Sequence, residues 1–322
     1  MTFPARTVWA LFAASLLTLV ACSSPPPADE PTGEVTDRAW TIVVGEDPLQ
    51  RTVAHTYALA LTSRGAPVLV EPREGEVAES ASELGEGDGS GHDMVLAGTL
   101  SLAAQLAAAA DADADADADA LDASAEELTE QIESELQGGV LLEPPAAMLS
   151  HAVVMTEVTA AQHSIESSAE ADDPAVAEAC EELRVGVGAE LVEPEEKLDE
   201  LYDCQPEQIS TGTEDELVQQ VIAAELDAVI ISDSHPGIGE NALITLADSE
   251  RGFPQEQQAL VVREGIAEEV PDVAGEVAER LDDDAILVMR QLIDGEQGLE
   301  PRDAAEYWLV EQDLIAAPEG WG

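Results

Sequence analysis

Few residues in this sequence occur in types and spacings that could do chemistry. The five histidines lack the spacing of metal ligands: His55, His92, His151, His163 and His235. A lone histidine is more often a surface or packing residue than a catalyst. The aspartates that alternate with alanine over residues 111–120 could attract a cation, but calcium loops need glycine turns and mixed oxygen ligands that are missing here. We therefore expect no metal site and no cofactor, and interpret residues 111–120 as a solvated, acidic, low-complexity insertion.

The motifs of common enzyme classes are also missing. The sequence has no Gly-x-Ser-x-Gly elbow, no Walker-type phosphate loop and no His-Glu-x-x-His pair. Gly186-Val187-Gly188 follows an apolar run as in a dinucleotide-binding turn, but the third glycine is absent and Glu190 stands where a phosphate would approach. We expect that the protein is not an enzyme. An extracytoplasmic hydrolase is the weakest alternative, because no nucleophile and base stand out as a pair.

Cys22 could carry a lipid. Arg6 precedes an apolar stretch too short to span a bilayer comfortably, which ends in Leu-Val-Ala-Cys at Cys22. This ending resembles the lipobox of lipoprotein precursors. We predict a signal peptide over residues 1–22 and an extracytoplasmic protein anchored to the cell membrane by lipid on Cys22. The alternatives are an ordinary secretory signal with an incidental cysteine, and an uncleaved anchor.

Cys180 and Cys204 remain once Cys22 is assigned to lipid. An even number of cysteines in an oxidising compartment predicts a disulfide between them.

The charge balance excludes one class of partner. The chain has 69 acidic residues against 12 lysines and arginines, a formal net charge of −57, and removal of the first 22 residues would take away only Arg6. Such a polyanion cannot displace counterions from phosphates, so we expect no nucleic-acid partner. Solubility outside the cell explains this charge better than an acidic active surface does.

The elements that must position any site alternate between strand and helix. Residues 23–37 are rich in proline, serine and acids and predict a disordered linker. Residues 40–45 predict a buried strand, 49–63 a helix and 67–70 a second strand, whereas the acidic, glycine-rich residues 71–92 predict a surface loop. Further apolar runs and helical patterns alternate as far as residue 312. This order predicts an α/β fold with largely parallel strands.

Several short motifs resemble the osmoprotectant family of ABC-transporter substrate-binding proteins, which bind glycine betaine and choline. They are Val44-Gly45, Tyr57-Ala58-Leu59, Gly98-Thr99-Leu100, Leu142-Glu143-Pro144-Pro145-Ala146, the run from Leu226 to Asp233, Leu246-Ala247-Asp248, Phe253-Pro254, and Pro301 to Leu314. The sequence is similar to a divergent member of this family.

The resemblance implies a two-lobed, periplasmic-binding-protein-like (type II) α/β fold with a cleft at the hinge. Lobe 1 would comprise residues 38–147 and 247–318, and lobe 2 residues 148–246. The two lobes would close over a small solute and present it to an ABC permease.

The expected binding site departs from the family. Quaternary amines are held by cation–π contacts in a cage of aromatic rings, yet the family's tyrosines fall here at Leu96, near His151 and near Glu256. Most remaining aromatic residues, including Tyr57, Tyr307 and Trp308, have helical spacing typical of a core.

Polar and acidic side chains could partly replace the cage. The candidate ligand-binding residues are Thr99, His151, Glu190, Ser232, Asp233 and Glu256. The carboxylates would favour a cation, and a solute with N–H donors would satisfy them better than betaine. Two hypotheses remain. One is a solute receptor for a small cationic or zwitterionic solute; the other is a degenerate homologue acting as an envelope interaction or sensor protein without a transported ligand.

Overall fold

The computed structural model describes residues 39–75, 77–84, 91–110, 123–166, 171, 174–189, 191, 194–246, 253, 255–295 and 297–318. The predicted signal peptide with Cys22, the linker 23–37, the insertion 111–120 and Glu190 lie outside these residues. Contacts within the chain group Thr36–Gly322 into one compact unit. None of the described helices combines the length and the apolar character needed to cross a bilayer.

The first of two sheets has the strand order β2-β1-β3-β10-β4. β1 pairs in parallel with β2 and β3, whereas β10 runs antiparallel to β3 and β4. The strands are β1 (Trp40–Val44), β2 (Val68–Pro72), β3 (Met94–Gly98), β4 (Gly139–Leu141) and β10 (Gln258–Arg263).

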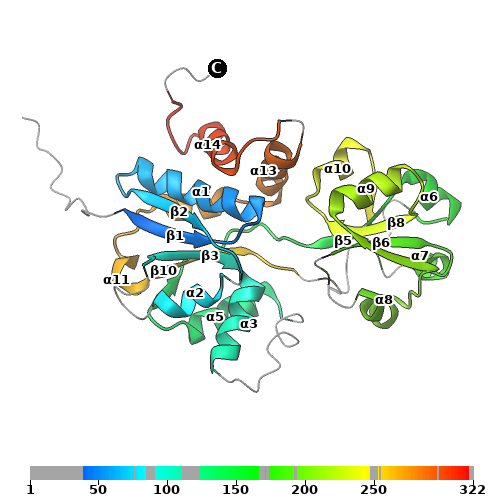
Figure 1. Ribbon diagram of the computed structural model, residues 1–322, viewed down its shortest axis with the longest axis horizontal. Coiled ribbons are helices and arrows are strands. Elements are labelled where there is room, and N and C mark those ends of the chain that lie inside the picture. Colours follow the sequence, from blue (N-terminus) through cyan, green and yellow to red (C-terminus); the bar gives the residue numbers. More distant parts are fainter. Residues whose placement is uncertain are drawn as a thin grey trace, which may run out of the picture. The chain divides into compact units, whose positions relative to one another are not determined.

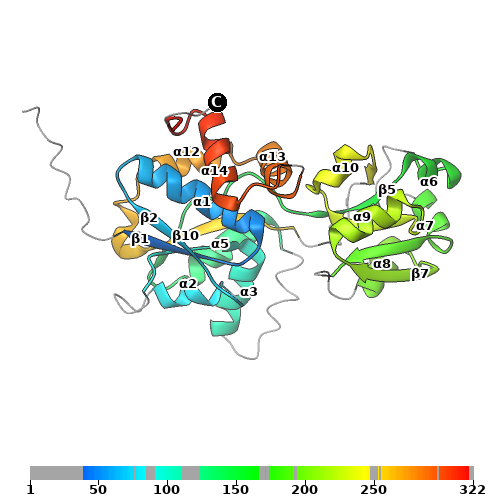
Figure 2. The same ribbon diagram turned by 45° about the horizontal axis from the view of Figure 1, so that its top comes forward.

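Helices cover both faces of this sheet (Figures 1 and 2). One face carries α1 (Pro48–Ser63), α11 (Glu264–Ala267), α12 (Val273–Arg280), α13 (Asp283–Asp294) and α14 (Pro301–Glu311). The other carries α2 (Glu79–Glu83), α3 (Thr99–Ala110) and α5 (Ala125–Glu135). Because both faces are covered, β1 and β3 are apolar along almost their whole length.

The second sheet has the strand order β7-β6-β8-β5-β9. β6 is parallel to β7 and β8, and β5 is antiparallel to β8 and β9. The strands are β5 (His151–Met155), β6 (Arg184–Gly188), β7 (Gln208–Gly212), β8 (Ala228–Ser232) and β9 (Ile244–Leu246). One face packs on α6 (Glu157–Gln162), α7 (Pro174–Cys180) and α8 (Pro194–Tyr202), and the other on α9 (Glu214–Ile222) and α10 (Pro236–Glu240).

An aspartate holds each sheet together in the same way. Asp93 directly precedes β3. Its N–H donates to the Thr41 carbonyl oxygen on β1, its carboxylate accepts from the Thr41 N–H, and it forms an ion pair with Arg263 at the end of β10. Asp227 directly precedes β8, and its carboxylate accepts two hydrogen bonds from the guanidinium of Arg184 on β6, at 2.8 and 2.9 Å. The two sheets are therefore built on one plan, with β1, β2 and β3 corresponding to β6, β7 and β8.

Two expectations about the secondary structure are wrong. The strands are not largely parallel: in the part of the chain that the structure describes, four strand pairs are parallel and four antiparallel. The antiparallel pairs involve β5 and β10, which enter their sheets from the opposite direction because the chain has come from the other sheet. The predicted loop 71–92 contains the end of β2 and the helix α2, since Val77, Ala81 and Leu84 form an apolar strip that packs on the core.

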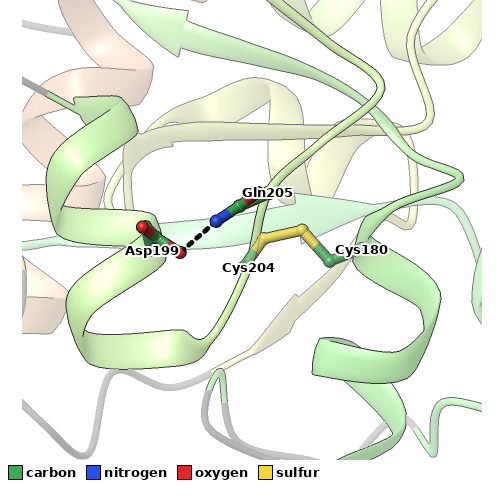
Figure 3. Close-up of a disulfide and its surroundings, with 4 residues drawn as sticks. All are labelled: Cys180, Asp199, Cys204 and Gln205. Carbon is green, nitrogen blue, oxygen red and sulfur yellow. Dashed lines mark hydrogen bonds between the residues drawn. A yellow bond between two sulfur atoms is a disulfide. The ribbon is translucent and has the colours of Figure 1, made fainter.

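The predicted disulfide joins Cys180 and Cys204 (Figure 3). Their Cα atoms are 5.4 Å apart and both residues are buried. Cys180 ends α7 and Cys204 follows α8, so the bond ties two helices of the second sheet. Beside it, the Gln205 Nε2 atom donates a hydrogen bond of 2.6 Å to Asp199 Oδ1.

Candidate functional site

A small cavity lies at the carboxyl ends of the parallel strands of the first sheet. Its volume is about 210 Å³ and its lining consists of Gly45, Gln50, Gly75, Val77, Ala78, Ala97, Gly98 and Ser101. Ligands of open α/β sheets bind at this edge, where strands end and helices begin. A larger cavity of about 510 Å³ lies among α12, α13 and α14, away from the strand ends. We therefore place the candidate site at the smaller cavity and the chain segments around it.

The segment that enters β10 is fixed to this edge through Thr99. Thr99 is fully buried at the start of α3; its backbone N–H donates to the Gln257 carbonyl oxygen at 2.9 Å, and its hydroxyl oxygen accepts from the Gln257 N–H at 3.1 Å. Leu149 and Glu256 form an isolated antiparallel bridge in the same region. Thr99 thus positions the neighbouring residue, Glu256.

The Glu256 carboxylate lies directly against Gly98. An alanine methyl group at residue 98 would overlap the carboxylate, so the side chain occupies space that only glycine leaves open. The backbone N–H of Leu100 donates a hydrogen bond to this carboxylate. The pKa of Glu256 is raised to about 7, chiefly by burial of the carboxyl group. Asp47 contributes to this rise, whereas His151 and the Leu100 N–H oppose it.

Asp233, which follows β8, lies beside Ser150, the residue directly before β5. The Ser150 hydroxyl donates to Asp233 Oδ2 at 2.5 Å, and the Asp233 N–H donates to the Ser150 carbonyl oxygen at 3.1 Å. Much of the residue is exposed, but the carboxyl group lies against the protein, and this desolvation raises the pKa of Asp233. Asp283 acts in the same direction, whereas Ser150 and His151 oppose it.

Ser232 hydrogen-bonds to residues that flank the second sheet. Its side chain is buried, its hydroxyl lies 2.9 Å from that of Ser234, and its N–H donates to Glu214 Oε1 at 2.6 Å. It also pairs with His151 across β8 and β5.

Five of the six residues expected from the sequence are therefore close to one another. His151 is an electrostatic neighbour of both Glu256 and Asp233, Ser232 pairs with His151, and Thr99 holds the segment that carries Glu256. Glu190 lies outside the described residues. Sequence reasoning missed Asp47, Gly98, Ser150 and Asp283. The contact between Gly98 and Glu256 leaves no recognisable pattern in the sequence, because the two residues are far apart in the chain.

The aromatic side chains that the structure describes do not form a cage at this edge. Among the described residues, Trp40, Tyr57 and Trp308 are buried in the first core, and Tyr202 stacks on Phe253 in the second with ring centroids 5.7 Å apart. The expectation that Tyr307 is a core residue is wrong: it is 37% exposed and lines the larger cavity. Consecutive helical residues point in different directions, and Trp308 takes the inward position on α14.

The architecture, two sheets with cores of their own and a polar edge where strands end, is that of a two-lobed substrate-binding protein. Residues 41–311 match the family described as the substrate-binding domain of the ABC-type glycine betaine transport system, and the chain belongs to this family.

Solved structures agree with this fold. One described as a glycine betaine/carnitine/choline ABC transporter has a TM-score of 0.67 and 14% identity, covering 85% of this chain and 99% of that one. The apo form of YehZ from Escherichia coli has a TM-score of 0.65 and 17% identity, covering 86% and 99%. A lactococcal protein in a closed complex with glycine betaine has a TM-score of 0.51 and 14% identity, covering 86% and 97%. No curated protein sequence matches the chain.

Proposed function

We propose that this protein is a lipid-anchored extracytoplasmic receptor that binds a small cationic or zwitterionic solute and presents it to an ABC permease. The observation that carries the proposal is the match to a transport substrate-binding family along residues 41–311, together with the acidic groups at the strand edge. The two lobes would be residues 38–147 with 247–318, and residues 148–246. The solute would contact Thr99, His151, Glu190, Ser232, Asp233 and Glu256.

A ligand screen tests solute binding. The chain from residue 23 onward should be heated with betaine, choline, carnitine, putrescine, spermidine and amino acids in turn. A ligand that binds only the folded state stabilises it by about 2.7 kcal/mol at 100 times its Kd, so at least one solute should raise the Tm measurably. The double variant Asp233→Asn, Glu256→Gln should reduce that rise without changing the Tm of the free protein by more than a few degrees.

Absence of any Tm rise across the panel would favour the second candidate, a degenerate binding-protein homologue that acts in the envelope as an interaction or sensor protein. The feature that supports this candidate is that no aromatic side chain lines the cavity at the strand edge among the residues the structure describes.

Membrane attachment has its own test. In the native host, the Cys22→Ala variant should move from the membrane fraction to the soluble extracytoplasmic fraction, because residue 22 is the predicted lipid acceptor. Replacement of a neighbour, Ser23→Ala, serves as the control and should leave the protein in the membrane fraction. Unchanged partitioning of Cys22→Ala would refute the lipid anchor.

A further inference from the structure

Two N–H groups in the first turn of α3 are already hydrogen-bonded to other parts of the protein. α3 begins at Thr99 and runs for 12 residues. The N–H groups of a helix's first turn have no partner within the helix and attract anions. Here the Thr99 N–H donates to the Gln257 carbonyl oxygen, and the Leu100 N–H donates to the Glu256 carboxylate. A carboxylate from a solute would find these two donors taken.

The residue at the end of β3 makes this arrangement possible. Gly98 has no side chain, and the Glu256 carboxylate lies where one would stand. The contact requires both the glycine and the direction in which the Leu149–Glu256 bridge holds the backbone of residue 256. The backbone around residues 98 and 256 therefore fixes the position of this carboxylate, unlike that of an exposed acidic side chain on the surface.

The charges around Glu256 also disfavour a second anion. Asp47, which caps α1, raises the pKa of Glu256, and His151 on β5 is the neighbouring group that opposes it. His151 also opposes the raised pKa of Asp233, whose other charged neighbour is Asp283. The His151 imidazole thus has two carboxyl neighbours, Glu256 and Asp233, and each of these has a further acid nearby, Asp47 and Asp283 respectively. In the part of the chain that the structure describes, no three histidine, cysteine or acidic side chains are placed to hold a metal ion.

We propose that Glu256 acts as a built-in counter-anion at the start of α3, and that the site selects organic ammonium ions without a carboxylate over zwitterions such as amino acids and betaines. The inference rests on the proposed solute-binding function and specifies its ligand class. Ammonium ions with N–H donors fit best, because they hydrogen-bond to carboxylate oxygens, whereas a fully methylated amine needs aromatic faces, which none of the described residues supplies at this edge.

Isothermal titration with matched probes tests the inference. Putrescine and 4-aminobutanoate have the same carbon chain length, but one end is an ammonium group in the first and a carboxylate in the second. Wild-type protein should bind putrescine at least tenfold more tightly, and Glu256→Gln should weaken putrescine binding at least tenfold and narrow the gap between the two probes. Glu269→Gln, an exposed site on the surface, is the matched control and should leave both affinities unchanged.

A second variant keeps the charge but moves it. In Gly98→Ala the methyl group displaces the Glu256 carboxylate from the Leu100 N–H, so 4-aminobutanoate should gain affinity relative to putrescine. Tighter or equal binding of 4-aminobutanoate by the wild type would overturn the inference, as would an unchanged preference in both Glu256→Gln and Gly98→Ala. In either case the solute-receptor function would stand. No binding of these probes or of any solute in the wider panel would overturn both.

Discussion

The Glu256 carboxylate illustrates how single side chains acquire their properties in this protein. Its surroundings come from three other parts of the chain: Asp47 before α1, the segment with Gly98 and Leu100 where β3 meets α3, and His151 on β5. None of these lies near it in sequence. In the protein without a solute, burial favours the neutral form and the pKa is raised to about 7; a bound ammonium ion would favour the ionised form, because an opposite charge stabilises it.

The raised pKa predicts a dependence of stability on pH. A carboxyl group with a folded-state pKa above its unfolded value binds protons more strongly when folded. Its stabilising contribution is therefore complete below about pH 4.5, its ordinary pKa, and is lost as the pH rises through about 7. Urea unfolding between pH 5 and 8 should show that wild-type protein loses more stability with rising pH than Glu256→Gln does.

The comparison between the two proteins cancels the contributions of the other acids. Glu269→Gln should follow the wild-type curve, since Glu269 is exposed. Parallel curves for wild type and Glu256→Gln would contradict the pKa shift.

At the scale of elements, Asp93 before β3 and Asp227 before β8 both link strands of their sheet through an ion pair with an arginine, but the two pairs differ in exposure. The Asp93 side chain is 2% exposed and that of its partner Arg263 is 20% exposed, whereas Asp227 and Arg184 are 23% and 36% exposed. The Arg184 guanidinium lowers the pKa of Asp227, chiefly through the hydrogen bonds between them. Solvent screens a pair of this kind much more than a buried one.

The two pairs should therefore differ in their effect on stability. Asp93→Asn removes the charge from a buried pair and should reduce the free energy of unfolding by about 3 kcal/mol, because the partly buried Arg263 guanidinium loses this counter-charge. Asp227→Asn keeps an acceptor in a partly solvated pair and should lose about 1 kcal/mol or less. Urea denaturation followed by circular dichroism measures both, and a larger loss for Asp227→Asn would contradict this ranking.

At the scale of the whole molecule, the described residues form separate hydrophobic cores on the two sheets. The first contains the buried tryptophans Trp40 and Trp308, and the second contains the disulfide and the stacked pair Tyr202 and Phe253. Chains with two such cores often depart from two-state unfolding. Fluorescence from Trp40 and Trp308 reports on the first core, whereas circular dichroism reports on the helices and strands of both sheets.

Loss of the disulfide should act on the second core. Its cysteines are 24 residues apart, and the chain-entropy relation gives about 3 kcal/mol for a loop of this size. For the chain from residue 23 onward, Cys180→Ser with Cys204→Ser should shift the circular-dichroism transition to lower urea concentration. The tryptophan-fluorescence transition should shift less, because Trp40 and Trp308 lie in the first core. Equal shifts in both signals would show that the cores unfold as one unit.

Local pattern determined much of the fold. The apolar runs of β1, β3, β6 and β8 and the helical spacing of α1 and α14 are visible in the residues themselves, because burial on both faces demands continuous apolar strands. The family resemblance in the sequence is confirmed by the match over residues 41–311. The pairing of Cys180 with Cys204 also followed from the cysteine count.

What the sequence by itself determined is thus the alternation of strands and helices, the family and the acidic character of the strand edge. Only the tertiary structure decided that β5 and β10 run antiparallel, that Tyr307 is exposed while Trp308 is buried, and that the Glu256 carboxylate lies on Gly98 at the start of α3. The physical reason is the range of the interactions. Propensity and periodicity act between neighbours in the chain, whereas strand direction, burial and a raised pKa depend on segments that only the folded chain brings together.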